Sequence, residues 1–255
     1  MEKTPILAIM YDFDHTLSPR DMQEYGFIPD LGMEADVFWN KCLKAMKRNQ
    51  MDQILAYMYM MLEEAKGKLI VNRNMLRALG KDVQLFDGVS DWFARVNEYA
   101  RSRGLQPEHY IISSGLKEII EGTPIAKEFK EIYAASFCYD EHGVACWPAM
   151  AVNYTSKTQF LFRVNKGVLD VTEHRALNEF MPEEKRRVPF SNMIYVGDGL
   201  TDVPSMKLTK LNGGHSIAVW QENEGVSNEM LLEGRVDLII SSDKPPREIA
   251  RLEER

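Results

Sequence analysis

Few cysteines, short apolar runs and no strongly basic segment set the first limits on this sequence. Only three of its 255 residues are cysteines, and none has the Cys-x-x-Cys spacing of redox or zinc motifs. The longest run without a charged or amide residue in the first half, 54–62, is far shorter than the roughly 18–20 apolar residues that span a bilayer. These absences argue against a disulfide-rich secreted domain, a zinc finger and a membrane-spanning protein.

The charge balance is acidic. Lysine and arginine number 31 against 38 aspartates and glutamates, a formal net charge of −7, and the longest basic block is only Lys185, Arg186 and Arg187. We therefore expect neither nucleic acid nor a membrane surface as a partner, but a small molecule. The apolar stretch 6–11 runs into Asp12 without a small-residue cleavage site, which predicts a cytoplasmic protein without a signal peptide.

From about Val83 onward, short apolar runs alternate with amphipathic segments. This alternation predicts an α/β fold with a doubly wound, mostly parallel sheet. A helix is expected over 90–103, with Gly104 just past its end, and others are expected to begin near Leu116, Lys157, Thr201, Val226 and Pro246. Charged residues 170–190 predict a further helical excursion. The expected strands are 6–11, 110–113, 132–136, 193–196, 217–220 and 238–240.

Residues 18–81 interrupt this alternation, because they contain no convincing strand and show helical periodicity. They predict an inserted α-helical cap, with the core formed by 1–17 and 82–255. One cap helix is expected to bury a face containing Val37, Phe38, Lys41 and Cys42, and the next a Met-rich face containing Ile54, Leu55, Met58, Met61 and Leu62. Outside the cap, 138–146 is typical of a β-hairpin with Gly143 in its turn.

Acidic side chains follow two of the expected strands. Asp12 and Asp14 come directly after 6–11, and Asp198 and Asp202 follow 193–196. Ligands of open α/β sheets bind outside the carboxyl ends of the strands, so the four acids are expected to meet there. We expect His15 to point away from their face, and Thr16 to fix the loop by hydrogen bonds.

The same edge is expected to hold groups that bind an anion. Ser113, Ser114 and Gly115 end another strand and can offer a hydroxyl and backbone N–H groups, and Lys157 supplies a cation at a helix start. An acidic cluster binds Mg²⁺ through hard oxygen ligands, while a lysine, a hydroxyl and N–H groups bind a phosphoryl group. The pattern therefore predicts a Mg²⁺-dependent phosphatase for a small phosphorylated metabolite.

The roles follow from this chemistry. Asp12 is the candidate nucleophile that forms an aspartyl-phosphate, and Asp14 is the candidate acid that protonates the leaving alcohol and then activates water. A phosphotransferase using the same intermediate and a non-catalytic protein that binds a phosphometabolite are the alternatives. An EF-hand starting at Asp12 is excluded by Leu17 and Gln23, which stand where that loop needs Gly and Glu.

The ordered motifs resemble those of the haloacid dehalogenase (HAD) superfamily: Asp-x-Asp-x-Thr from Asp12, a strand ending in Ser113, then Lys157, then Gly-Asp-Gly-x-x-Asp ending at Asp202. The helical segment after the first motif resembles the cap of the phosphoserine-phosphatase-like branch. This resemblance implies that Mg²⁺ is bound by Asp12, the main-chain carbonyl of Asp14 and Asp198, with support from Asp202, and that phosphate is held by Ser113 and Lys157.

Phosphoserine phosphatases use a glutamate after the first motif and a cap arginine to hold the serine part of their substrate. Here Asp21 is the nearest acid after the motif, and the apolar stretch 53–61 contains no arginine. This departure argues against phosphoserine as the substrate.

Overall fold

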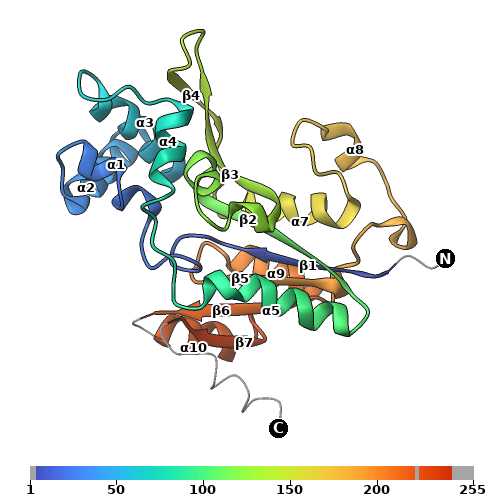
Figure 1. The fold of residues 1–255 in the computed structure, drawn as a ribbon. Helices are drawn as coiled ribbons and strands as arrows, with labels where there is room; N and C mark the ends of the chain where they lie inside the picture. Colours follow the sequence, from blue (N-terminus) through green and yellow to red (C-terminus); the bar gives the residue numbers. More distant parts are fainter. Residues whose placement is uncertain (1–3, 222–223, 243–255) are drawn as a thin grey trace.

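A mostly parallel sheet forms the centre of the molecule (Figure 1). The computed structural model describes residues 4–221 and 224–242, and within them the sheet has the order β4-β3-β2-β1-β5-β6-β7. All neighbouring pairs are parallel except the β3–β4 hairpin. The strands are β1 (Ile6–Tyr11), β2 (Gln106–Leu116), β3 (Phe129–Tyr139), β4 (Ala145–Met150), β5 (Met193–Gly197), β6 (His215–Trp220) and β7 (Leu238–Ser241).

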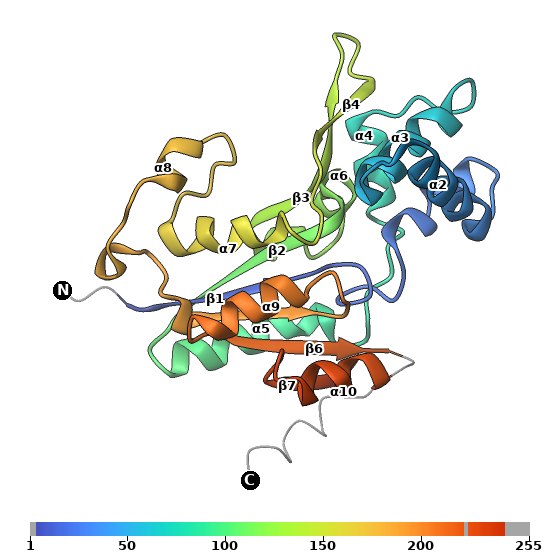
Figure 2. The same cartoon turned by 180° about the vertical axis from the view of Figure 1, so that it is seen from behind.

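Both faces of the sheet are covered, as the near-continuous apolar strands require. Ile9 and Tyr11 of β1 belong to the core on one face, whereas Ala8 and Met10 belong to the core on the other. The first face carries α5 (Val89–Ser102) and α6 (Lys117–Glu121), and the second carries α7 (Lys157–Lys166), α9 (Val203–Leu211) and α10 (Glu224–Leu232) (Figure 2). The predicted α/β, doubly wound, mostly parallel fold is confirmed.

Four short to medium helices occupy the chain between β1 and α5, and this segment contributes no strand to the sheet. In α3 the periodic apolar residues Ile54, Met58 and Met61 are buried, and the carboxylate of Asp52 caps the helix by accepting hydrogen bonds from the N–H groups at its start. The helices are α1 (Phe27–Asp30), α2 (Ala35–Asn49), α3 (Gln53–Ala65) and α4 (Arg73–Leu79).

Two predicted cap contacts are wrong. Val37 is 48% exposed and Leu55 is 36% exposed, because each lies at the edge of its helix's apolar stripe while Phe38 and Ile54 next to them are buried. The hairpin is confirmed, with Gly143 in the left-handed region at φ 76°. It stands beside the helical segment, where Ala145 N–H donates to the carbonyl of Val71 at 2.8 Å.

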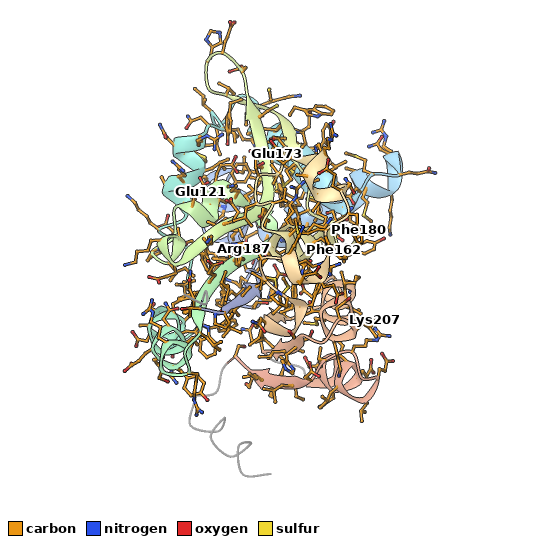
Figure 3. The ribbon with its side chains drawn as sticks, turned by 90° about the vertical axis from the view of Figure 1, so that its right-hand side faces the viewer. Glu121, Phe162, Glu173, Phe180, Arg187 and Lys207 are labelled. Atoms are coloured by element: carbon orange, nitrogen blue, oxygen red, sulfur yellow. The ribbon has the colours of Figure 1, made fainter. Side chains whose placement is uncertain are left out.

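The predicted helical excursion over 170–190 contains only the short helices α8 (His174–Asn178) and η3 (Glu183–Lys185). The buried guanidinium of Arg163 holds its start by donating to the carbonyls of Asp170 and Val171, at 2.6 and 2.9 Å. Its end is held by Arg187, which donates to both carboxylate oxygens of Glu108 on β2, at 2.7 and 2.6 Å (Figure 3). The excursion is therefore fixed to the core by side chains rather than by a long helix.

Across the part of the chain that the structure describes, every helix is too short or too polar to cross a membrane. The helix expected near Pro246 lies outside the described residues.

Candidate active site

The loop after β1 places Asp12 and Asp14 at the carboxyl edge of the sheet. Two hydrogen bonds hold Asp12 in place. Its backbone N–H donates to the Val196 carbonyl at 2.9 Å, and its side-chain Oδ1 accepts from Phe13 N–H at 2.7 Å. Asp14 Oδ1 accepts from Met22 N–H at 2.9 Å. The two carboxylates line one cavity, as their spacing predicted.

Lys157 joins two of the acids. It is the first residue of α7, its side chain is fully buried, and its Nζ donates to Asp12 Oδ2 and Asp202 Oδ1, both at 2.7 Å. Tyr195 of β5 donates its hydroxyl to the same oxygen of Asp202 at 2.7 Å. Thus β1, β5 and the starts of α7 and α9 are connected through a single buried ammonium group.

Asp198 completes a set of three carboxylates. One oxygen each from Asp12, Asp198 and Asp202 lies within 4.8 Å of the others, a geometry that suits a divalent cation. Thr16 donates its hydroxyl to Asp198 Oδ1 at 3.3 Å, which agrees with the loop-fixing role expected for it. The carboxyl group of Asp14 lies outside this set of three. Gly197 permits the close packing, because a Cβ there would lie 2.5 Å from the Asp202 carboxylate.

Two serines near the end of β2 lie on the same edge. Ser113 is buried, lines the cavity with Asp12 and Asp14, and accepts Gly115 N–H on its Oγ at 3.0 Å. Ser114 also lines that cavity, and its hydroxyl donates to the Val152 carbonyl at 2.7 Å. Gly115 lies against Asp14 instead, since a Cβ on it would be 2.8 Å from Asp14 Oδ2.

Two adjoining cavities meet at Asp14. The first, here called the acid cavity, has a volume of about 440 Å³ and is lined by Asp12, Asp14, Ser113 and Asp198, among others. The second, the cap cavity, has about 420 Å³ and extends from Asp14 between α2 and α3. Asp14 lines both, so its carboxyl group lies where the two spaces join.

Two hydrogen bonds tie the helical segment to this edge. Asp52, the cap of α3, accepts on Oδ2 from Asn153 Nδ2 at 2.9 Å, and the amide oxygen of Asn153 in turn accepts the N–H groups of Thr155 and Ser156 just before Lys157. Tyr57 of α3 donates its hydroxyl to the Ser114 carbonyl at 2.7 Å. The sequence analysis missed these partners, although Asp52 immediately before an apolar helix is a recognisable helix-capping signal.

Burial sets the protonation of the acids in the metal-free site. It raises the pKa of Asp12 to about 6 and that of Asp198 to about 8, with further increases from the charge of Asp202 on both. Burial also raises the pKa of Asp14 well above its usual range, as do the charges of Asp21 and Asp12. The direction of the Asp14 pKa shift favours the protonated carboxyl group that a general acid needs.

The orientation predicted for His15 is wrong. Its side chain lines the acid cavity, with Nε2 3.7 Å from Asp21 Oδ1. The prediction assumed an extended chain, but His15 has φ 58°, and a residue in the left-handed region does not follow the alternation of a strand.

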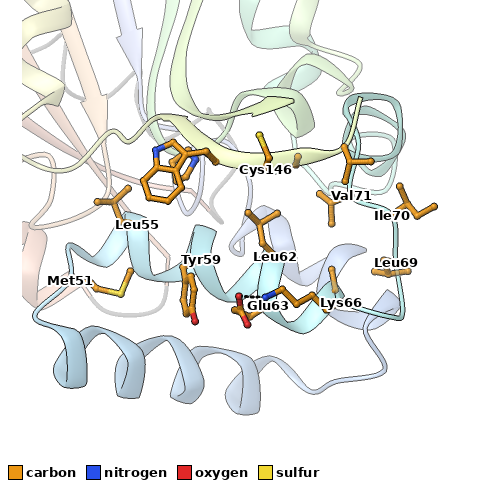
Figure 4. A pocket seen from close by; sticks show the side chains of 15 residues that line it. Met51, Leu55, Tyr59, Leu62, Glu63, Lys66, Leu69, Ile70, Val71 and Cys146 are labelled. Carbon is orange, nitrogen blue, oxygen red and sulfur yellow. Dashed lines mark hydrogen bonds and ion pairs between the residues drawn. The ribbon is translucent and has the colours of Figure 1, made fainter. Parts of the chain in front are cut away.

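A larger cavity, of about 580 Å³, lies away from these acids. It is an apolar space between α3 and β4, lined by Leu55, Tyr59, Leu62 and Cys146 among others, and Figure 4 shows Leu55 and Leu62 of α3 facing the strand. It contains none of the predicted site residues, so size alone does not identify the site in this molecule.

Comparison with known proteins agrees with this geometry. The model of the haloacid dehalogenase-like hydrolase family matches residues 9–207, and the chain belongs to this family. An uncharacterized protein of Borreliella burgdorferi is 25% identical over 264 residues, covering 92% of this chain and 90% of that protein. The family confirms that the chain is a hydrolase.

Solved structures share the fold. A substrate-bound phosphoserine phosphatase is similar with a TM-score of 0.61 at 15% identity, over 98% of this chain and 99% of that one. A HAD family hydrolase from Salmonella enterica serovar Typhi has a TM-score of 0.59 at 15% identity, over 93% of this chain and 68% of that one. These similarities show that the chain shares the fold of these proteins.

We predict that the metal-free protein becomes less stable as pH rises from about 6.5 to 8. The folded chain keeps a proton on Asp198, with a pKa of about 8, and on His15, with a pKa of about 9, which the unfolded chain releases at lower pH. The free energy of unfolding therefore falls with rising pH, by about 1–2 kcal/mol for the Asp198 proton alone. The opposite effect of His109, whose pKa burial lowers to about 4, is confined to lower pH.

Denaturant unfolding in EDTA across this pH range measures the effect. Asp198→Asn should make the decline shallower by removing the share that Asp198 contributes, whereas Asp36→Asn, which changes an exposed acid on α2, should leave the decline unchanged. A wild-type stability that rises or stays constant from pH 6.5 to 8 contradicts the protonation described for the site.

Proposed function

We propose that this protein is a Mg²⁺-dependent phosphatase that hydrolyses small phosphomonoesters through an aspartyl-phosphate on Asp12. The observation that carries the proposal is the arrangement of Asp12, Asp14 and Lys157. One carboxylate is held by a buried ammonium group, and a second, with a raised pKa, lines the same cavity. This arrangement supplies a nucleophile and a proton donor side by side.

The donor set suits Mg²⁺. Asp12, Asp198 and Asp202 offer only carboxylate oxygens, the hard ligands that this ion prefers. Asp12 and Asp202 are buried, and the pKa values of Asp12 and Asp198 are raised. Lys157 offsets only part of this negative charge, so a further cation would stabilise the site. When bound, Mg²⁺ would offset negative charge on the phosphoryl oxygens. The chain's own residues supply the remaining chemistry.

In the first step a carboxylate oxygen of Asp12 attacks phosphorus, and the bond between phosphorus and the alcohol oxygen breaks. Asp14 gives its proton to that oxygen, so a neutral alcohol leaves. Hydrogen bonds from Phe13 N–H and Lys157 hold the Asp12 carboxylate in place for the attack. Ser113, which lines the acid cavity, is placed to contact a phosphoryl oxygen.

In the second step the Asp14 carboxylate takes a proton from water as the water oxygen attacks phosphorus. The bond between phosphorus and Asp12 breaks, which releases inorganic phosphate and restores both carboxyl groups. Asp14 lies at the junction of the acid cavity and the cap cavity, so it can reach the leaving oxygen and, after the alcohol departs, the water that replaces it.

Residues 18–81 serve in this proposal as a cap over a core formed by 1–17 and 82–255. Support comes from the cap cavity, whose walls are α2, α3, the loop after β1 and the end of β2, and from the Asp52–Asn153 hydrogen bond between the two parts. The cap encloses the alcohol part of a small phosphorylated metabolite. A cytoplasmic location stays a prediction of the sequence.

The direct test is release of phosphate from p-nitrophenyl phosphate with Mg²⁺ and with EDTA. We expect turnover with Mg²⁺, loss of turnover with EDTA, and a decrease of more than about a thousandfold in kcat for Asp12→Asn, because the amide lacks the nucleophilic charge. The exposed-acid variant Asp36→Asn should match the wild type. Near-normal turnover by a folded Asp12→Asn protein would exclude the covalent route.

Substrates with different leaving groups distinguish the proton-donor role of Asp14 from the nucleophilic role of Asp12. Asp14→Asn removes the proton donor, so it should reduce kcat/KM for an alkyl phosphate at least about tenfold more than for p-nitrophenyl phosphate, whose phenolate leaves without a proton. The comparison uses kcat/KM because it reports the first step, whereas kcat also contains the hydrolysis of an aspartyl-phosphate that both substrates share. Equal losses on both substrates would show that Asp14 acts by holding the loop instead.

A further inference from the structure

The cap cavity is lined by acids, aromatic rings and apolar side chains. Among the described residues that line it there is no lysine, arginine or histidine. A carboxylate or second phosphate on the alcohol part of a substrate would thus enter this space close to Asp21 and Asp14, without a cationic partner among the residues that line it. His15, whose Nε2 lies 3.7 Å from Asp21 Oδ1, lines the acid cavity instead. The lining excludes an anionic alcohol by charge.

Two aromatic residues of the cavity, Trp39 and Tyr57, lie with their rings nearly perpendicular to each other, an arrangement here called the aromatic corner. The rings of Trp39 and Tyr57 lie with centroids 6.3 Å apart at 78°. Trp39 Nε1 already donates to Glu24 at 2.8 Å and the Tyr57 hydroxyl to Ser114 at 2.7 Å, so the rings are fixed and their polar groups are occupied. The faces of such rings attract a positively charged nitrogen.

A buried acceptor gives independent support. Gln23 is only 2% exposed and lines the cap cavity, and its Oε1 has no hydrogen-bond partner within the described structure. A buried carbonyl oxygen without a donor is costly, and a ligand with N–H groups would satisfy it. Asp21, with a side chain 39% exposed, lines both cavities and adds a negative charge.

We infer that the cap cavity selects phosphomonoesters whose alcohol carries a positively charged amino or ammonium group and no carboxylate. This inference rests on the proposed phosphatase function and names its substrate class. The phosphate occupies the acid cavity beside Asp12, the alcohol oxygen lies at Asp14, and the cationic group lies between Asp21, Gln23 and the ring of Trp39.

Three phosphate esters of matched size test this selection. 2-Aminoethyl phosphate carries the cation, 2-hydroxyethyl phosphate replaces the amine by a neutral group, and O-phosphoserine adds a carboxylate to the aminoethyl skeleton. We expect kcat/KM to be at least about tenfold higher for 2-aminoethyl phosphate than for either of the others, since an exposed cation–aromatic contact and one carboxylate together supply about that discrimination. Equal values, or a preference for O-phosphoserine, would overturn the inference.

Substitution of Asp21 tests whether the cationic group of the substrate binds beside this carboxylate. Asp21→Asn should lower the ratio of kcat/KM for 2-aminoethyl over 2-hydroxyethyl phosphate by about three- to tenfold, while Asp36→Asn, on an exposed position of α2, should leave the ratio unchanged. Any effect of Asp21 on the pKa of Asp14 cancels in this ratio, because both esters release similar alcohols. A ratio unaffected by Asp21→Asn would contradict the assigned position of the cation.

Turnover of p-nitrophenyl phosphate distinguishes an error in the substrate class from an error in the proposed phosphatase function. If the wild type hydrolyses it with Mg²⁺ but shows no preference for the amine, the substrate class is wrong and the phosphatase function stands. If no phosphate ester is hydrolysed, the proposed function fails, and the substrate class fails with it.

Discussion

The ammonium group of Lys157 lies between the carboxylates of Asp12 and Asp202, with all three side chains buried, and the geometry of the site depends on this contact. Placing such charges in a protein interior costs several kcal/mol per ion, and only short, well-directed hydrogen bonds offset that cost. The positions of β1, α7 and α9 are therefore coupled. A shift in any of them would leave at least one buried charge without its partner.

The arrangement leaves an excess of negative charge at the sheet edge. One lysine serves two acids, and Asp198 adds a third carboxyl group, whose pKa burial and its neighbours raise to about 8. A further cation, as the proposed function requires, would offset this excess. The helical segment adds the second constraint, since Asp52 and Tyr57 fix α3 to the loop that carries Asn153 and to Ser114 near the end of β2.

The strands, the helical segment after β1 and the candidate acidic residues could be predicted from the sequence because each has a local signal. Asp12 and Asp198 follow apolar strands, and the strand–helix alternation fixes the edge where they meet. Contacts that depend on three-dimensional packing had no such signal. The turn at His15, with its positive φ, reversed the expected direction of that side chain, and the exposure of Val37 depends on how α2 lies against its neighbours.

The cap cavity also depends on packing that local sequence does not reveal. Phe38 and Met58 are core residues that helical periodicity identifies, but the corner formed by Trp39 and Tyr57 and the buried amide of Gln23 arise from packing between separate segments. Local sequence therefore predicted the position of the acidic residues better than the shape of the cap cavity.

The central claim is that the phosphoryl group passes through Asp12, and trapping it there is the most direct measurement. The wild type and the Asp14→Asn variant are mixed with Mg²⁺ and a phosphate ester that the wild type hydrolyses. The reactions are quenched in acid within the first turnovers, and the proteins are digested for mass spectrometry. The account predicts one added phosphoryl group on the peptide that contains Asp12, with a larger fraction in Asp14→Asn because its hydrolysis step is slowed. Continued phosphate release with no modified peptide, or with the group on another residue, would contradict it.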